Sequence, residues 1–184
     1  MLKHFVLAAL VILSVPAVAR TQPPDRTDAQ VFKDVAKQVT SYTRYTVFDD
    51  IRGSVDGGVL TLSGKVTMPF KRDDLGRLTA RVPGVKRVIN KIEVLPVSFD
   101  DDRLRYEVAH AIYGNPAFWH YASMVNPPIH VVVERGNVNL TGVVNSEVER
   151  MLARSIACRF PAFSVTSELR TDKEARVELE LAVK

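Results

Sequence analysis

The fold of this chain is decided by the stretch GVLTLSGKV, Gly58–Val66. The same pattern returns 78 residues later as GNVNLTGVV, Gly136–Val144. In both copies apolar and polar side chains alternate, which is typical of a strand with one buried face. At the same offset, Val82-Pro83 matches Phe160-Pro161. A single offset shared by two separate blocks indicates two homologous units of about 70 residues.

The sequence around each copy predicts the same order of elements. Asp28 begins a run in which Val31, Val35 and Val39 recur every three or four residues, as on one face of a helix. Asp56-Gly57-Gly58, between two alternating runs, is a strong hairpin signal. This order predicts an α+β fold of two tandem αββαβ domains, each a small mixed sheet packed on two helices. The expected helices lie at 28–39, 70–82, 101–112 and 148–160, and the expected strands at 47–55, 60–66, 88–94, 129–133, 138–144 and about 165–169.

The C-terminal tail adds one element to the second unit. Residues 177–183 alternate between apolar and polar after a polar turn at 171–174. This alternation predicts an extra C-terminal edge strand on the second domain, with its glutamates toward water. Because a domain of about 70 residues has a marginal core, we expect the two units to pack together or to gain from this strand.

The first nineteen residues have the plan of a secretory signal peptide. Lys3 precedes an apolar run from Phe5 to Val15, and Ala17-Val18-Ala19 forms a small-x-small cleavage site. The apolar run is shorter than the roughly 20 residues that a spanning helix needs, which disfavours a membrane anchor, the alternative reading. We therefore expect a periplasmic protein with no transmembrane segment after cleavage. The expected organisation is a signal peptide at 1–19, a Pro-containing leader at 20–27, a first domain at 28–97 and a second domain at 98–184.

Composition and motifs exclude several classes of function. With 25 Lys and Arg against 21 Asp and Glu, the net charge of +4 is too small to indicate a nucleic-acid-binding protein. His110, His120 and His130 are ten residues apart, so no two of them form a metal-binding pair on one helix. Neither a nucleophile elbow nor a phosphate-binding loop is present. Paired carboxylates such as Asp49-Asp50 are explained by capping and solvation. We expect no catalytic residue, no metal and no cofactor, so the protein is predicted not to be an enzyme.

Five residues of the repeat invite a structural role. Gly58 and Gly136 stand in hairpins that require a positive φ. Gly64 and Gly142 lie within strands, where glycine permits a bulge or a close backbone approach. Cys158 takes the position of Ala80 in the repeat, so we expect a buried and inert thiol. The alternative for this cysteine is a disulfide-linked dimer, because exported proteins meet an oxidising compartment.

The repeated pattern resembles the BON domain family (bacterial osmotic-protection and nodulation domain). The resemblance rests on Gly-x-apolar-x-Leu-x-Gly-x-Val, on Pro83-Gly84-Val85 and on the closing stretch VKRVINKIEV at 85–94, and it covers about 28–97 and 100–171. The second copy departs from the pattern, with Ala162 for the turn glycine and Ser167 for the asparagine. The resemblance implies a small αββαβ fold in envelope proteins, contact with phospholipid surfaces or envelope partners, and no shared catalytic residue. A link to osmotic stress is suggested by the family name alone.

Two features of the sequence favour contact with a membrane. Residues 28–97 carry 12 basic and 8 acidic side chains, whereas 98–184 carry 10 and 12, so anionic lipid would be attracted to the first unit. A long insert in the second unit contains aromatic side chains, which favour headgroup depth when exposed. The first hypothesis is weak association with anionic phospholipid, and the alternative is a protein-interaction or structural module of the envelope. The candidate contact residues are Lys71, Arg72, Lys86, Arg87, Phe118, Trp119 and Tyr121.

Overall fold

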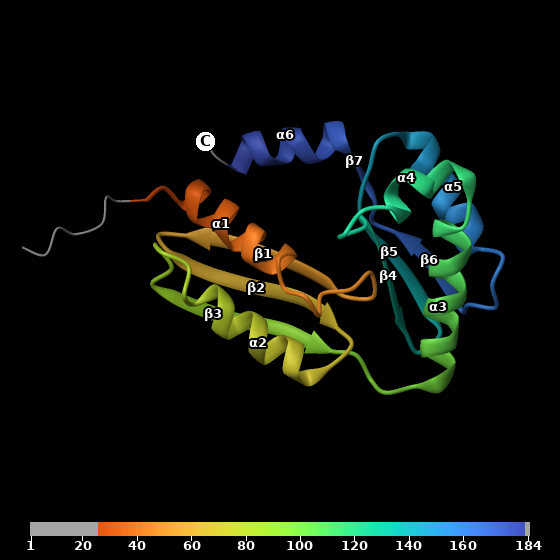
Figure 1. The fold of residues 1–184 in the computed structure, drawn as a ribbon, viewed down its shortest axis with the longest axis horizontal. Coiled ribbons are helices and arrows are strands. Elements are labelled where there is room, and N and C mark those ends of the chain that lie inside the picture. Colours follow the sequence, from red (N-terminus) through yellow and green to blue (C-terminus); the bar gives the residue numbers. More distant parts are fainter. Residues whose placement is uncertain (1–25, 183–184) are drawn as a thin grey trace, which may run out of the picture.

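The computed structural model describes residues 26–182, with side chains to Val177, and it contains two α+β units in tandem (Figure 1). The expected signal peptide and most of the expected leader lie outside the described residues. Within 26–182, no helix is both long and apolar enough to cross a membrane.

The first unit is a three-stranded mixed sheet with two helices on one face. Its sheet order is β1-β2-β3, in which β1 is antiparallel to β2 and β3 is parallel to it. Val31, Val35 and Val39 of the first helix pack on the sheet, where Leu60 and Leu62 are fully buried. The elements are α1 (Asp28–Thr40), β1 (Asp50–Asp56), β2 (Val59–Val66), α2 (Pro69–Thr79) and β3 (Arg87–Val94).

The second unit repeats this plan with additions. Its sheet order is β4-β5-β6, and the short β7 pairs with the far end of β5. The core gathers Val108, Ile112, Leu140 and Ile156 from the helices and the sheet. The elements are α3 (Phe99–Tyr113), η1 (Pro116–Phe118), α4 (Trp119–Ala122), β4 (Ile129–Glu134), β5 (Asn137–Val144), α5 (Glu147–Ala157), β6 (Ser164–Ser167), β7 (Arg170–Thr171) and α6 (Asp172–Ala182).

The expectation of a C-terminal edge strand is wrong, because residues 172–182 form helix α6. Thr171 and Glu174 form a reciprocal capping box, in which the Glu174 amide donates to Thr171 Oγ1 and the Thr171 amide donates to Glu174 Oε2. Asp172 and Arg176 add an ion pair of 2.8 Å one turn apart. The residues that follow are mostly Glu, Leu and Ala, which are strong helix formers. Capping and propensity therefore outweigh the alternation of the tail.

Candidate functional site

A loop of the first unit packs against the second unit. Residues 41–49 connect α1 to β1, and we call them the docking loop. The Val47 carbonyl accepts a 2.7 Å hydrogen bond from the Val131 amide of β4. Phe48 packs against the core of the second unit and meets Tyr106 edge-on, with ring centroids 4.7 Å apart. The first unit thus supplies part of the packing of the second.

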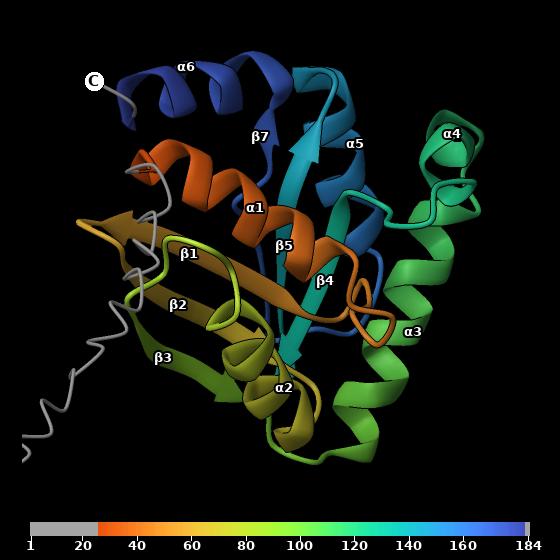
Figure 2. The same cartoon turned by 60° about the vertical axis from the view of Figure 1, so that its left-hand side comes forward.

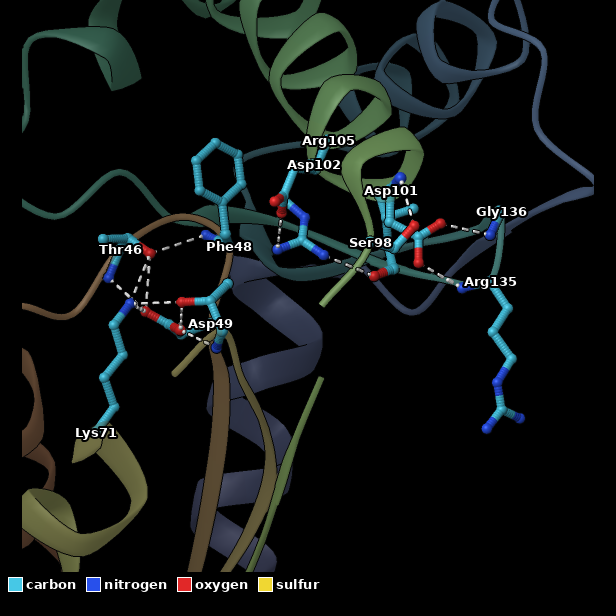
Figure 3. A network of polar contacts seen from close by, with 12 residues as sticks. Thr46, Phe48, Asp49, Lys71, Ser98, Asp101, Asp102, Arg105, Arg135 and Gly136 are labelled. Carbon is cyan, nitrogen blue, oxygen red and sulfur yellow. Dashed lines mark hydrogen bonds and ion pairs between the residues drawn. The ribbon is translucent and has the colours of Figure 1, made fainter. Parts of the chain in front are cut away.

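A buried carboxylate fixes the conformation of the docking loop (Figure 3). Asp49 accepts hydrogen bonds from the Thr46 amide at 2.9 Å and from the Thr67 amide at 2.9 Å. The Lys71 ammonium of α2 donates to Asp49 Oδ2 at 2.6 Å. A buried charge is tolerated only when it is paired and hydrogen-bonded, and this one has both kinds of partner.

A second buried carboxylate closes the hairpin of the second unit. Asp101, in the first turn of α3, accepts the backbone amides of Arg135 and Gly136 at 2.8 and 2.7 Å (Figure 3). In the first unit Asp28 accepts the amides of Gly57 and Gly58 in the same way. These aspartates therefore link each unit's first helix to its β-hairpin, a structural role that spacing in the sequence did not reveal.

A polar cleft lies between the two sheets. It is lined by the face of each sheet that no helix covers. The volume of the cleft is about 520 Å³. Arg52 of β1 donates to Glu168 at 2.5 Å, and Lys65 of β2 pairs with Glu134 of β4. Hydrogen bonding to Arg52, and secondarily to Asn139, holds the pKa of Glu168 below its usual value. The charges of the cleft are thus largely paired across it.

An adjoining pocket of about 410 Å³ extends the cleft toward the docking loop. His130 and Thr141 are register partners on β4 and β5, and both line this pocket. Burial lowers the pKa of His130 from its ordinary value, and the weaker attraction of Asp50 opposes that effect. The imidazole is therefore neutral at physiological pH.

The four cations proposed from the sequence are not brought together. Lys71 is buried in its pair with Asp49, so its predicted role in lipid contact is wrong. Arg72 is exposed at the start of α2, whereas Lys86 and Arg87 lie at the start of β3, at the opposite end of the sheet. Because a strand of eight residues spans about 26 Å, these groups do not form one basic patch.

Two of the three aromatic candidates in the insert are buried. Phe118 lies fully inside the second core and Tyr121 is 3% exposed, so their predicted contact with a lipid or partner surface is wrong. The Tyr121 hydroxyl donates to Glu149 at 2.7 Å, which fixes the insert on α5. Trp119 is 63% exposed and its indole N–H reaches the Gly114 carbonyl at 3.3 Å. Trp119 alone among the three aromatic candidates is available at the surface.

The sequence interpretation missed a surface at the edge where two parallel strands end. The Leu95 amide donates to the Val66 carbonyl at 2.8 Å, so the segments after β2 and β3 leave the sheet side by side. Both views show the start of α2 and the connection from β3 to α3 at this end of the molecule (Figures 1 and 2). The exposed apolar side chains there are Met68, Phe70, Val97 and Phe99, which we call the exit surface.

The exit surface carries apolar groups that are well exposed. Val97 is 97% exposed and Phe99 80% exposed. Arg44 of the docking loop lies over the Phe70 ring at 5.0 Å from its centroid, and Arg72 follows one position after the buried Lys71. The signal in the sequence was that apolar residues follow the predicted ends of two strands. Met68 and Val97, for example, lie outside every expected helix and strand, so no expected element buries them.

The expectation of a buried Cys158 is wrong. Cys158 is exposed at the end of α5, because the helix turns this position away from the core that Ala157 enters. His110 is also exposed, on α3. Among the described residues, no group of three His, Cys, Asp or Glu side chains is arranged to hold a metal ion.

The two strand glycines have one physical cause. Gly64 and Gly142 have φ values of 113° and 111°, in a region that disfavours side chains. A Cβ on Gly64 would lie 2.0 Å from the Asp50 carbonyl oxygen, and one on Gly142 would lie 1.9 Å from that of Pro128. Because neither glycine has a Cβ, the second strand of each hairpin can lie close to the chain at the start of the first strand.

Comparison with known proteins agrees with this duplicated geometry. No curated protein matches the sequence. Two solved structures of CdsD, a structural protein of the type III secretion system of Chlamydia trachomatis, are similar at 14% and 13% identity, the second being its C-terminal domain. They cover 80% and 74% of this chain and 98% and 96% of their own, with TM-scores of 0.29 and 0.27, too low to support an argument. The sequence model of the BON domain matches residues 27–96 and 119–171. The chain therefore belongs to the BON domain family.

Proposed function

We propose that this protein is a non-catalytic periplasmic module that associates weakly with anionic phospholipid at an envelope membrane, through the exit surface. Membership of the BON domain family points to an envelope module. The observation that carries the proposal is the exposure of Val97 and Phe99, on a segment that leaves the sheet next to the one that carries Met68 and Phe70. Apolar side chains that are exposed close together at a surface mark interaction sites.

The chemistry of the exit surface favours an anionic membrane. Arg44 and Arg72 flank its apolar side chains, and each cation near an anionic surface contributes about 1 kcal/mol of attraction. Four side chains penetrate only the headgroup region, so the binding is expected to be reversible and sensitive to salt.

Trp119, Lys86 and Arg87 lie away from the exit surface. α3 is 15 residues long, so its start at Phe99 is about 22 Å from the insert that follows its end. Lys86 and Arg87 lie at the end of the first sheet remote from the exit surface. We propose Trp119 and, separately, Lys86 with Arg87 as weaker contacts, each of which is tested independently of the first.

Vesicle co-sedimentation of residues 20–184 tests the proposal. We expect binding to phosphatidylglycerol vesicles at low salt, and little binding at high salt or to phosphatidylcholine. Replacing Val97 and Phe99 by serine should remove most of the binding, and Arg72→Glu should weaken it. Val148→Ser is the matched control, because Val148 is 67% exposed on α5, away from the exit surface.

Each contrary result has a defined meaning. Absence of binding to any vesicle would contradict the lipid proposal and favour an envelope protein as the partner. If binding survives the Val97 and Phe99 changes but is lost in Trp119→Ala, the contact moves to the insert. If it is lost instead on reversing Lys86 and Arg87, the contact moves to the start of β3.

A further inference from the structure

His130 lies where the second unit meets the docking loop of the first. Its ring is 5.3 Å from the ring of Tyr45, between centroids. The next residue, Val131, donates its amide to the Val47 carbonyl across the two units. Nδ1 of His130 is buried and has no hydrogen-bond partner among the described residues. The imidazole is therefore part of the packing between the units.

The charged groups that face His130 come from the docking loop, β1 and the segment after β6. Asp49 is already engaged by Lys71, and Glu168 is engaged by Arg52. Asp50 is paired with Arg52 at 3.1 Å. The facing groups are Tyr45, Asp49, Asp50, Arg52, Glu168 and Arg170, and on the side of the insert the lining residues Val125, Asn126 and Pro127 are uncharged.

We infer that His130 makes the docking of the first unit on the second sensitive to acid, so that its protonation loosens the docking loop from β4. Nδ1 has no hydrogen-bond partner in the docked arrangement. The attraction of Asp50 and backbone hydrogen bonding by Thr46 and Asp49 favour the cation, but burial of the ring outweighs them, so protonation of the docked imidazole is disfavoured. Separation of Tyr45 from His130 exposes the ring to water, which solvates the cation.

The direction of the effect follows from linkage. Burial lowers the pKa of His130 in the docked state, so the undocked state binds the proton more readily. Docking is therefore fully stable above the ordinary histidine pKa and loses stability as pH falls below it. Glu168 titrates at lower pH, since its pKa is held below its usual value. We therefore compare docking between about pH 7 and pH 5, a window that spans the ordinary pKa of histidine.

The Val131 amide reports docking directly, because it is bonded to the other unit. We would measure its hydrogen-exchange protection factor by NMR in the full chain, correcting for the pH dependence of intrinsic exchange. Protection should fall by up to about tenfold per pH unit between the two pKa values, as one proton is taken up on opening. The Val132 amide faces the opposite way, toward β5, and should keep its protection.

Two variants separate this role from a general effect of pH. His130→Phe keeps an aromatic ring against Tyr45 but cannot take up a proton, so Val131 protection should become independent of pH in this range. His110→Gln removes an exposed histidine of α3 and should leave the pH dependence intact. Constant protection of Val131 in the natural chain would overturn the inference. So would a pH dependence that persists in His130→Phe, or an equal loss at Val132.

Discussion

The Lys71 ammonium lies 2.6 Å from Asp49 Oδ2, and the two side chains are 7% and 0% exposed. Asp49 is the last residue of the docking loop before β1, whereas Lys71 is in the first turn of α2. The pair therefore ties a helix of the first unit to the loop that reaches the second. One ion pair stabilises both the fold of a unit and its contact with its neighbour.

Replacing Lys71 by methionine should lower the free energy of unfolding by about 3 kcal/mol. The change leaves Asp49 buried and charged without its cation, and breaking a buried pair from one side costs about 3–5 kcal/mol. Urea unfolding followed by circular dichroism measures the loss. Arg72→Met is the control, because the exposed pair of Arg72 with Asp73 is worth less than about 1 kcal/mol. Equal losses in the two variants would contradict the structural role of the buried pair.

Asp101→Asn should destabilise the protein more than Asp28→Asn. Each aspartate accepts two amides of its hairpin turn, but Asp101 is 3% exposed whereas Asp28 is partly exposed. An amide keeps one acceptor and loses the other, and an unsatisfied buried amide costs about 1–3 kcal/mol. Chemical denaturation of the two variants under one set of conditions gives the ranking. A larger loss of stability in Asp28→Asn than in Asp101→Asn would contradict burial as the cause of the difference.

Gly142→Ala should cost about 3 kcal/mol, because the new Cβ would stand 1.9 Å from a backbone oxygen and force the hairpin apart. Gly53→Ala in β1 provides the comparison, since its Cβ would meet only side chains at 3.7 Å or more. We expect thermal unfolding to show a clear loss for Gly142→Ala and little change for Gly53→Ala. A tolerated alanine at 142 would mean that Pro128 moves freely.

Thr171→Ala should weaken α6 by about 1 kcal/mol through loss of the N-terminal cap. Backbone chemical shifts of residues 172–182 report the helical population directly. Thr166→Ala is the matched control, because Thr166 lies in β6 and its hydroxyl donates to the Val138 carbonyl of β5, not to α6. Strand-like shifts over the tail of the natural chain would contradict the helix itself.

Arg52→Gln should raise the pKa of Glu168 toward its ordinary value, because hydrogen bonding to Arg52 is the largest cause of the depression. In the natural chain the contribution of Glu168 to stability is present above its unfolded pKa and lost as pH falls through the folded one. NMR titration of the Glu168 carboxyl measures its pKa in the two proteins, and denaturant unfolding at several pH values measures its contribution to stability. An unchanged pKa in Arg52→Gln would show that the ion pair across the cleft does not form in solution.

The repeated elements could be predicted because each has its own local signal. The valines of α1 recur at helical spacing, and Asp56-Gly57-Gly58 marks the hairpin, so the residues themselves indicate the order of elements. The sequence signals conflict at α6, because the alternation of its last residues predicts a strand whereas the capping box at its start favours a helix. The capping box of Thr171 and Glu174 was visible in the sequence, and it decides the local structure.

The candidate site was harder to predict, because charge and aromaticity do not reveal burial. Lys71 and Phe118 carry the groups expected at a membrane surface, but both are buried in the folded chain. Lys71 is buried because Asp49, 22 positions earlier, folds onto it, and only tertiary structure brings them together. The exposure of Val97 and Phe99 likewise depends on where β3 and α3 are placed.

Phe48 belongs to the first copy of the repeat but packs on the core of the second. The two copies have therefore ceased to be interchangeable parts. A second copy transplanted alone into another protein would leave the apolar side of Tyr106 uncovered, and a first copy alone would present Phe48 to solvent. Separating the two copies would therefore expose apolar surface on both sides of the break, surface that their tandem arrangement covers.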